Sequence, residues 1–149
     1  MKHYFAYGTL LSTKAMQDFA PSAQPVGVMR LDGFELGFAE TKKPGTGGCW
    51  LQPTPGGTVY GVQFEVSDED LARMDAASGV PEGLWVHCPI TVRDEHDNSV
   101  ETMTYTIPGS PGPFRPSKDY VGKIKLGLAT VKLPADYVTR VDSRLDAIV

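Results

Sequence analysis

The stretch KHYFAYGTLLS, residues 2–12, places three aromatic side chains within five residues and then ends on Gly8-Thr9. Aromatic residues favour β-strands, so we predict a strand over residues 3–7 followed by a turn. The residues after it, 11–19, predict a short helix. A glycine turn between a strand and a helix lets backbone N–H groups approach an anion or a developing oxyanion. An ordinary buried strand and turn has the same pattern, so this segment alone leaves both interpretations open.

The rest of the chain alternates short apolar runs with glycine- and proline-rich punctuation. Sixteen glycines and twelve prolines are typical of strands joined by turns. We predict strands over 25–39 with a turn at Asp32-Gly33, over 47–53 and over 58–66, and a hairpin over 85–107 turning at 94–98. We predict helices over 67–77, 117–131 and 134–149. The pattern predicts one α+β domain over residues 1–149.

Composition excludes several classes of function. The net charge is −4 and the chain has no basic tract, so we expect no nucleic-acid partner. No apolar stretch has the length of a membrane span, and residues 2–7 lack the apolar core of a signal peptide, so we expect a cytoplasmic protein. Cys49 and Cys88 stand alone, as do the three histidines, and we therefore expect no disulfide framework, no metal and no cofactor.

Five segments, taken together, resemble one known family. YFAYGTLL resembles the N-terminal signature of the γ-glutamylcyclotransferase-like (AIG2-like) family, whose strand–turn motif is Tyr-Gly-Ser-Leu or a near variant. The family's order continues through VMRLDGFELGF, QPTPGGTVYGVQFEV, LARMDAASGVPEGLWVHCPITV and PSKDYVGKIKLGLATVKLPADYVTRV. The resemblance covers nearly the whole chain. It implies a small mixed β-barrel flanked by helices, with a cavity at one barrel end.

The resemblance also implies a reaction. Family enzymes, classed as transferases or lyases, bind a γ-glutamyl compound whose own α-amine attacks its γ-carbonyl, which releases 5-oxoproline. Such an enzyme needs a small-molecule substrate and no cofactor, and we expect it to work as a monomer or homodimer. The substrate-binding positions that the resemblance implies here are Tyr7, Gly8, Thr9, Leu10 and Tyr120.

One position departs from the family pattern. The family's proton-transfer glutamate lies in Leu-Asp-x-x-Glu-Gly, and this chain has Met-Asp-Ala-Ala-Ser-Gly, with Ser78 at the glutamate position. A serine hydroxyl has no useful basicity near neutral pH, and no histidine lies near it in sequence to activate it. From the residues alone, Ser78 is simply the end of a helix before Gly79. Glu82 is a tentative substitute acid/base, and Asp75 and His87 are further candidates.

Three functions follow from these features. The first is an enzyme that acts on a γ-glutamyl or other small amide compound with a relocated acid/base. The second is a non-catalytic relative, a pseudoenzyme, that binds a small carboxylate-bearing ligand or a protein. The third is an interaction domain whose cavity is filled. Trp85 and His87 are two residues apart, so we expect them to share a strand face, and the indoles of Trp50 and Trp85 either narrow the cavity or only pack.

Overall fold

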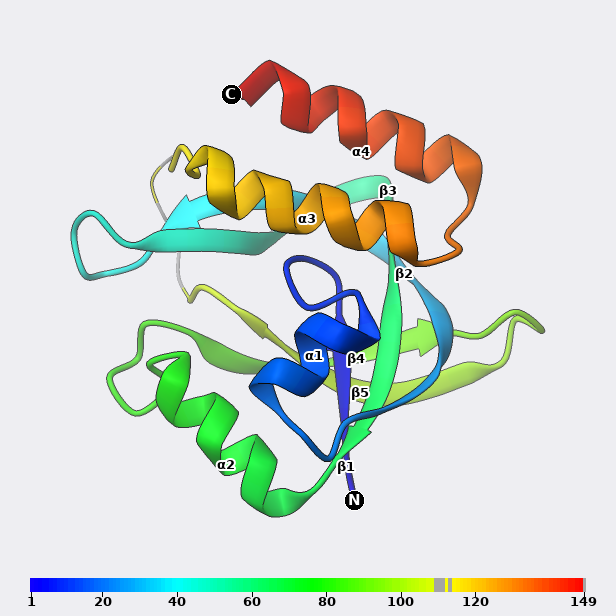
Figure 1. The fold of residues 1–149 in the computed structure, drawn as a ribbon. Helices are drawn as coiled ribbons and strands as arrows, with labels where there is room; N and C mark the ends of the chain where they lie inside the picture. Colours follow the sequence, from blue (N-terminus) through cyan, green and yellow to red (C-terminus); the bar gives the residue numbers. More distant parts are fainter. Residues whose placement is uncertain (109–111, 113, 149) are drawn as a thin grey trace.

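The computed structural model describes residues 1–108, 112 and 114–148 (Figure 1). Its elements, in chain order, are β1 (Lys2–Ala6), α1 (Thr13–Phe19), β2 (Gln24–Glu40), β3 (Gly47–Val66), α2 (Asp68–Ala77), β4 (Val86–Arg93), β5 (Ser99–Thr106), α3 (Lys118–Thr130) and α4 (Ala135–Ile148). The predicted α+β class is confirmed. The last position of the predicted C-terminal helix, residue 149, lies outside the described residues.

The strands form one five-stranded sheet in the order β1-β3-β2-β4-β5. Every strand pair in the described part of the chain is antiparallel, and β2 meets β4 only where Arg30 pairs with Arg93. No ladder between described residues joins β1 to β5, so the word barrel applies only loosely. Two side-chain hydrogen bonds connect the β1 segment to β5 instead. Thr104 Oγ1 donates to the Phe5 carbonyl at 2.6 Å, and Tyr7 Oη donates to the Tyr105 carbonyl at 2.9 Å.

Two predicted interruptions of the strands are wrong. The turn expected at Asp32-Gly33 and the break expected near residues 54–57 both lie within continuous strands, β2 and β3. The ladder jumps there from Asp32–Thr58 to Phe34–Pro53, so that four residues of β3 face Gly33 alone. Gly33 has φ = 88°, a conformation that glycine adopts without strain. β2 and β3 therefore stay paired on both sides of Gly33 and residues 54–57, which form a bulge that bends the strands.

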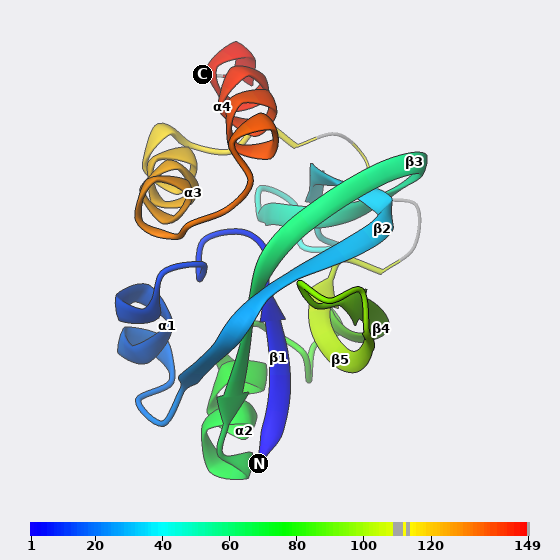
Figure 2. The same cartoon turned by 90° about the vertical axis from the view of Figure 1, so that its right-hand side faces the viewer.

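The helices begin where the sequence predicts because serine side chains cap them. Ser12, Ser67 and Ser117 each accept a hydrogen bond from the backbone N–H three residues later, at 3.1 Å. In both views α3 and α4 lie beside each other at one end of the molecule (Figures 1 and 2). Figure 2 shows α1 and the β4–β5 hairpin on opposite sides of β1. The loop after β1 runs between α1 and α3.

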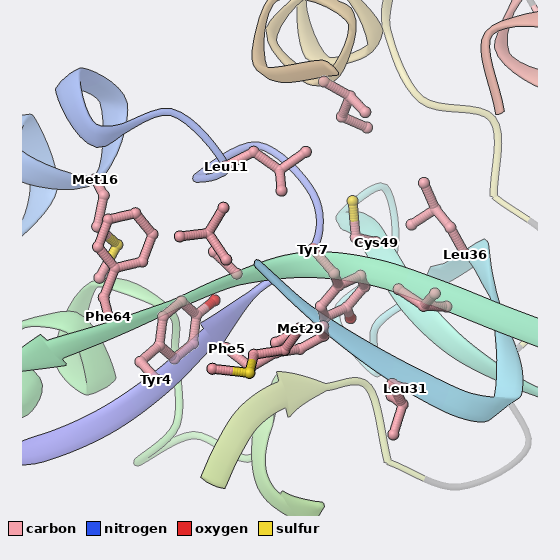
Figure 3. Packing of buried hydrophobic residues seen from close by; sticks show 14 of the residues in the cluster. Tyr4, Phe5, Tyr7, Leu11, Met16, Met29, Leu31, Leu36, Cys49 and Phe64 are labelled. Carbon is pink, nitrogen blue, oxygen red and sulfur yellow. The ribbon is translucent and has the colours of Figure 1, made fainter. Parts of the chain in front are cut away.

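The core lies between the strands and the helices. Phe5, Phe64 and Met16 are completely buried, and each such apolar side chain contributes about 1.5–3 kcal/mol of transfer free energy. Figure 3 shows Met16 of α1 near Phe64 of β3, and Tyr7 at the end of β1 near the Cys49 side chain of β3. This packing holds the β1–α1 loop against the sheet.

Candidate functional site

The β1–α1 loop borders a cavity of about 400 Å³. The lining combines backbone of the loop with aromatic side chains from several elements. It consists of Tyr4, Tyr7, Gly8, Thr9, Leu10, Phe19, Gly47, Cys49, Ser78, Trp85, Tyr105 and Tyr120. All four predicted loop positions, Ser78 and Tyr120 therefore lie around one space, although they come from three distant parts of the sequence.

One wall of the cavity is backbone. Within the described part of the chain, no oxygen accepts a hydrogen bond from the N–H groups of Gly8, Thr9 and Leu10. A Cβ at position 8 would lie 2.5 Å from Cys49 Sγ, so only glycine allows the loop to approach β3 this closely. The Thr9 N–H is hydrogen-bonded to the Cys49 sulfur. N–H groups without an oxygen acceptor at a concave surface are suited to a carboxylate or to a carbonyl oxygen that gains negative charge.

Tyr120 reaches the cavity from the first turn of α3. Its hydroxyl oxygen accepts a hydrogen bond from the Cys49 backbone N–H at 2.8 Å. Burial, and then the neighbouring Cys49, raise the pKa of the Tyr120 hydroxyl well above its ordinary value. Tyr120 is thus a neutral phenol that joins α3 to β3 at the edge of the cavity.

Ser78 reaches the cavity from the end of α2. It is the C-terminal cap of the helix, and its N–H donates to the Met74 carbonyl at 2.9 Å. The other end of α2 is held by Asp70, a buried carboxylate that accepts a hydrogen bond from the Ser22 N–H at 2.7 Å. Hydrogen bonds to this carboxylate from Ser22 hold the pKa of Asp70 below its usual value. The helix is therefore anchored with Ser78 turned to the cavity.

Asp75 lies one helical turn before Ser78 and makes two contacts with the β4–β5 hairpin. The Tyr105 hydroxyl donates to Asp75 Oδ1 at 2.5 Å, and His87 Nε2 lies 2.7 Å from the same oxygen. Burial first, and then the Asp75 carboxylate, raise the pKa of Tyr105 well above its ordinary value. Tyr105 lines the cavity, so the carboxylate acts on the cavity through this phenol.

The structure separates Glu82 from the other two candidate acid/base residues, Asp75 and His87. Glu82 is exposed and lines a different depression, together with Lys42, Lys43 and the outer side of α2. His87 lines a groove with residues of β1 and β5. It is paired with Tyr105 across the β4–β5 ladder, with ring centroids 5.7 Å apart, and Asp75 contacts both side chains. Of these residues, Asp75 alone is bonded to a side chain that lines the cavity.

The expectation that Trp85 and His87 share a strand face stays a prediction, because Trp85 lies outside β4. Trp85 precedes β4, which begins at Val86, and it lines the cavity while His87 lines the groove. Trp50 does not belong to the cavity's described lining and packs beside Gly37. The rule of alternating side chains applies only within the strand.

The remaining chemistry-bearing groups are weak candidates. Burial raises the pKa of the Cys49 thiol to about 12 and also raises that of Cys88, so neither is disposed to form a thiolate. Among residues 1–108, 112 and 114–148, no three His, Cys, Asp or Glu side chains gather as a metal-ligand set. No helix in that described part is long and apolar enough to cross a bilayer.

Sequence reasoning missed Tyr105, Tyr4 and Phe19 as cavity residues. Tyr4 and Tyr105 are packed together, with ring centroids 5.3 Å apart. Aromatic residues in strands most often build the core, so nothing local distinguishes Tyr105 from a packing residue. The only signal in the sequence is Asp75, which stands at the aspartate of the family's Leu-Asp-x-x-Glu-Gly pattern. Its partner, Tyr105, lies 30 residues farther along the chain.

Known proteins with this sequence pattern share the fold. Residues 58–141, more than half of the chain, match the sequence profile of the AIG2-like family. Gamma-glutamylcyclotransferase of Bos taurus is 29% identical over 145 residues, which cover 94% of this chain and 77% of the bovine protein. The Homo sapiens protein of the same name is 29% identical over 139 residues, which cover 90% of this chain and 73% of the human protein.

A solved structure of a gamma-glutamyl cyclotransferase superimposes with a TM-score of 0.87. The match has 27% sequence identity and covers 99% of this chain and 88% of the other. The sheet, the four helices and their order therefore follow one shared architecture, which includes the β1–α1 loop and α2.

Proposed function

The chain belongs to the AIG2-like family, and from this premise we propose that its cavity binds a small γ-glutamyl compound or a related amide or carboxylate. We propose further that Ser78, at the position of the family's proton-transfer glutamate, leaves little or no conventional cyclotransferase activity. The alternative is a non-catalytic domain on the same fold that binds a protein or a different small ligand.

The observation that carries this proposal is the backbone wall. The N–H groups of Gly8 and Leu10 make no hydrogen bond to an oxygen of the described chain, that of Thr9 meets only the Cys49 sulfur, and all three residues border a cavity of about 400 Å³. That volume lies within the range of small-molecule sites. Another part of the lining carries the polar atoms of Ser78 and Tyr105. A compact ligand with both an acceptor and a donor group matches this arrangement.

The same geometry supports the proposal that proton transfer is the weakened part of the reaction. In a γ-glutamyl compound the attacking amine is tethered to the carbonyl, so proximity is supplied by the substrate itself. The loop N–H groups stabilise the negative charge that develops on the carbonyl oxygen. Proton removal from the ammonium and proton delivery to the leaving nitrogen require a carboxylate, which a serine hydroxyl cannot replace.

The test measures binding and turnover separately. The purified protein is titrated with γ-glutamyl-alanine by calorimetry, and 5-oxoproline release is assayed beside the bovine relative. We expect saturable binding with turnover lower by about 10²–10⁴-fold, the usual contribution of a general acid/base. Turnover equal to that of the relative overturns the loss of proton transfer. Absence of binding to γ-glutamyl-alanine and to other γ-glutamyl amides overturns the ligand assignment.

A further inference from the structure

A carboxylate remains in the wall of the cavity although the family glutamate position is a serine. Asp75 Oδ1 is contacted by Tyr105 of β5 and His87 of β4, residues 30 and 12 positions away in sequence. The Asp75 side chain is 24% exposed, and the cavity-facing partner, Tyr105, is buried. The function proposed above uses neither Asp75 nor His87.

The hydrogen bond to Asp75 decides whether the Tyr105 hydroxyl donates or accepts a hydrogen bond on the cavity side. A phenol has one proton, and that proton is donated to the carboxylate, so the oxygen has only acceptor capacity left for the cavity. Three other tyrosines line the cavity, and of these Tyr4 packs against the Tyr105 ring. Tyr7 donates to the Tyr105 carbonyl, and Tyr120 accepts from the Cys49 N–H. Tyr105 is thus a phenol oxygen that is both backed by a negative charge and open to a donor.

The two walls therefore have opposite polarity. The loop wall offers donors, and the Tyr105 wall offers an acceptor beside a carboxylate. A positively charged nitrogen is the ligand group that gains most from such an acceptor, because hydrogen bonds to charged groups are stronger than neutral ones. The wall thus predicts where the ammonium end of a ligand lies.

We propose, building on the proposed function, that Tyr105 accepts a hydrogen bond from the α-ammonium group of the bound γ-glutamyl compound. Asp75 is the positioning residue that holds the phenol in its accepting orientation. His87, from the neighbouring groove, donates its Nε2–H to the same carboxylate oxygen and limits rotation of the Asp75 side chain.

A purely structural role of the Tyr105–Asp75 bond makes a different prediction. The bond also ties β5 to α2, so its loss in a structural role would weaken every ligand alike. An ammonium acceptor, in contrast, affects only ligands that carry the ammonium. The decisive readout is therefore the ratio of two affinities.

The experiment uses γ-glutamyl-alanine and glutaryl-alanine, which differ only in the α-ammonium group. We expect the wild-type protein to prefer γ-glutamyl-alanine by about tenfold or more, because a hydrogen bond to a charged group contributes about 1.5–3 kcal/mol and each tenfold is 1.4 kcal/mol. Tyr105→Phe should remove this preference while it changes the affinity for glutaryl-alanine little. A preference that survives in Tyr105→Phe, or equal losses for both ligands, overturns the proposal. If the wild-type protein binds neither ligand, the proposed function itself fails.

Asp75→Leu provides a second variant. Leucine has a similar shape and no hydrogen-bond acceptor, so the phenol proton is released toward the cavity and the ratio of affinities should fall at least as far as in Tyr105→Phe. Tyr60→Phe is the matched control, because Tyr60 packs against Tyr137 and is not among the residues that line the cavity. Its affinity ratio should equal that of the wild type, and thermal unfolding of each variant identifies a loss of fold. An Asp75→Leu protein that is folded and keeps the wild-type ratio contradicts the positioning role.

Discussion

The two walls of the cavity are built differently. The loop wall consists of consecutive residues, 7–10, and presents backbone N–H groups. The other wall consists of side chains from α2 and β5, among them Ser78 and Tyr105. Backbone groups remain when side chains change, unless a new Cβ collides with a neighbour. Side-chain groups change their chemistry with a single substitution. Under the function we propose, this construction lets ligand binding persist while the proton chemistry changes.

Ser78→Glu tests the side-chain wall and has the largest expected effect. The position borders open space, so a longer polar side chain fits without overpacking. A carboxylate there should raise 5-oxoproline release from γ-glutamyl-alanine by about 10²–10⁴-fold over the parent. Ser78→Gln is the matched control, with nearly the same volume and no basicity. Equal rates for the Glu and Gln variants would show that the site has changed beyond this one residue.

Gly8→Ala tests the backbone wall. The added Cβ would lie 2.5 Å from Cys49 Sγ, so the loop must shift away from β3. We expect a loss of about 1–3 kcal/mol in the free energy of unfolding, measured with denaturant, and loss of γ-glutamyl-alanine binding. The control is Gly27→Ala, where a Cβ meets nothing within 4 Å. Unchanged binding in Gly8→Ala would mean that the ligand does not depend on the loop.

Tyr120→Phe tests how the loop wall is supported. The change removes the acceptor of the Cys49 N–H bond, and water from the cavity is able to replace it. The free energy of unfolding should therefore fall by only about 0.5–1.5 kcal/mol. The affinity for γ-glutamyl-alanine, measured by calorimetry, should fall less than in Gly8→Ala. A larger loss of affinity in Tyr120→Phe would assign the phenol a direct contact with the ligand.

Glu82→Gln has the smallest expected effect. Glu82 is exposed and lies in a depression that contains Lys42 and Lys43, apart from both walls. The free energy of unfolding should change by less than about 0.5 kcal/mol, and ligand binding and 5-oxoproline release should stay as in the parent. If the parent has activity and Glu82→Gln abolishes it, then Glu82 is the relocated acid/base and the assignment of the two walls is wrong.

Local sequence was sufficient for the helices and for the loop wall. Serine caps at positions 12, 67 and 117 act within three residues, so a short window contains the complete signal. The aromatic strand and its glycine turn are also contiguous, and the resemblance to the family follows from such segments in order. These features depend on neighbours in the chain, which a sequence lists directly.

The continuity of β2 and β3 was decided by their pairing with each other. Asp32-Gly33 has the chemistry of a turn, and the neighbouring strand converts it into a bulge because the ladder resumes on both sides. The placement of Glu82, Asp75 and His87 was decided in the same way. All three belong to one stretch of 13 residues, and the orientation of α2 against the β4–β5 hairpin sends one to an outer depression, one to the Tyr105 phenol and one to a groove. A side chain's partner 30 residues away depends on how whole elements pack, and only the tertiary structure contains that information.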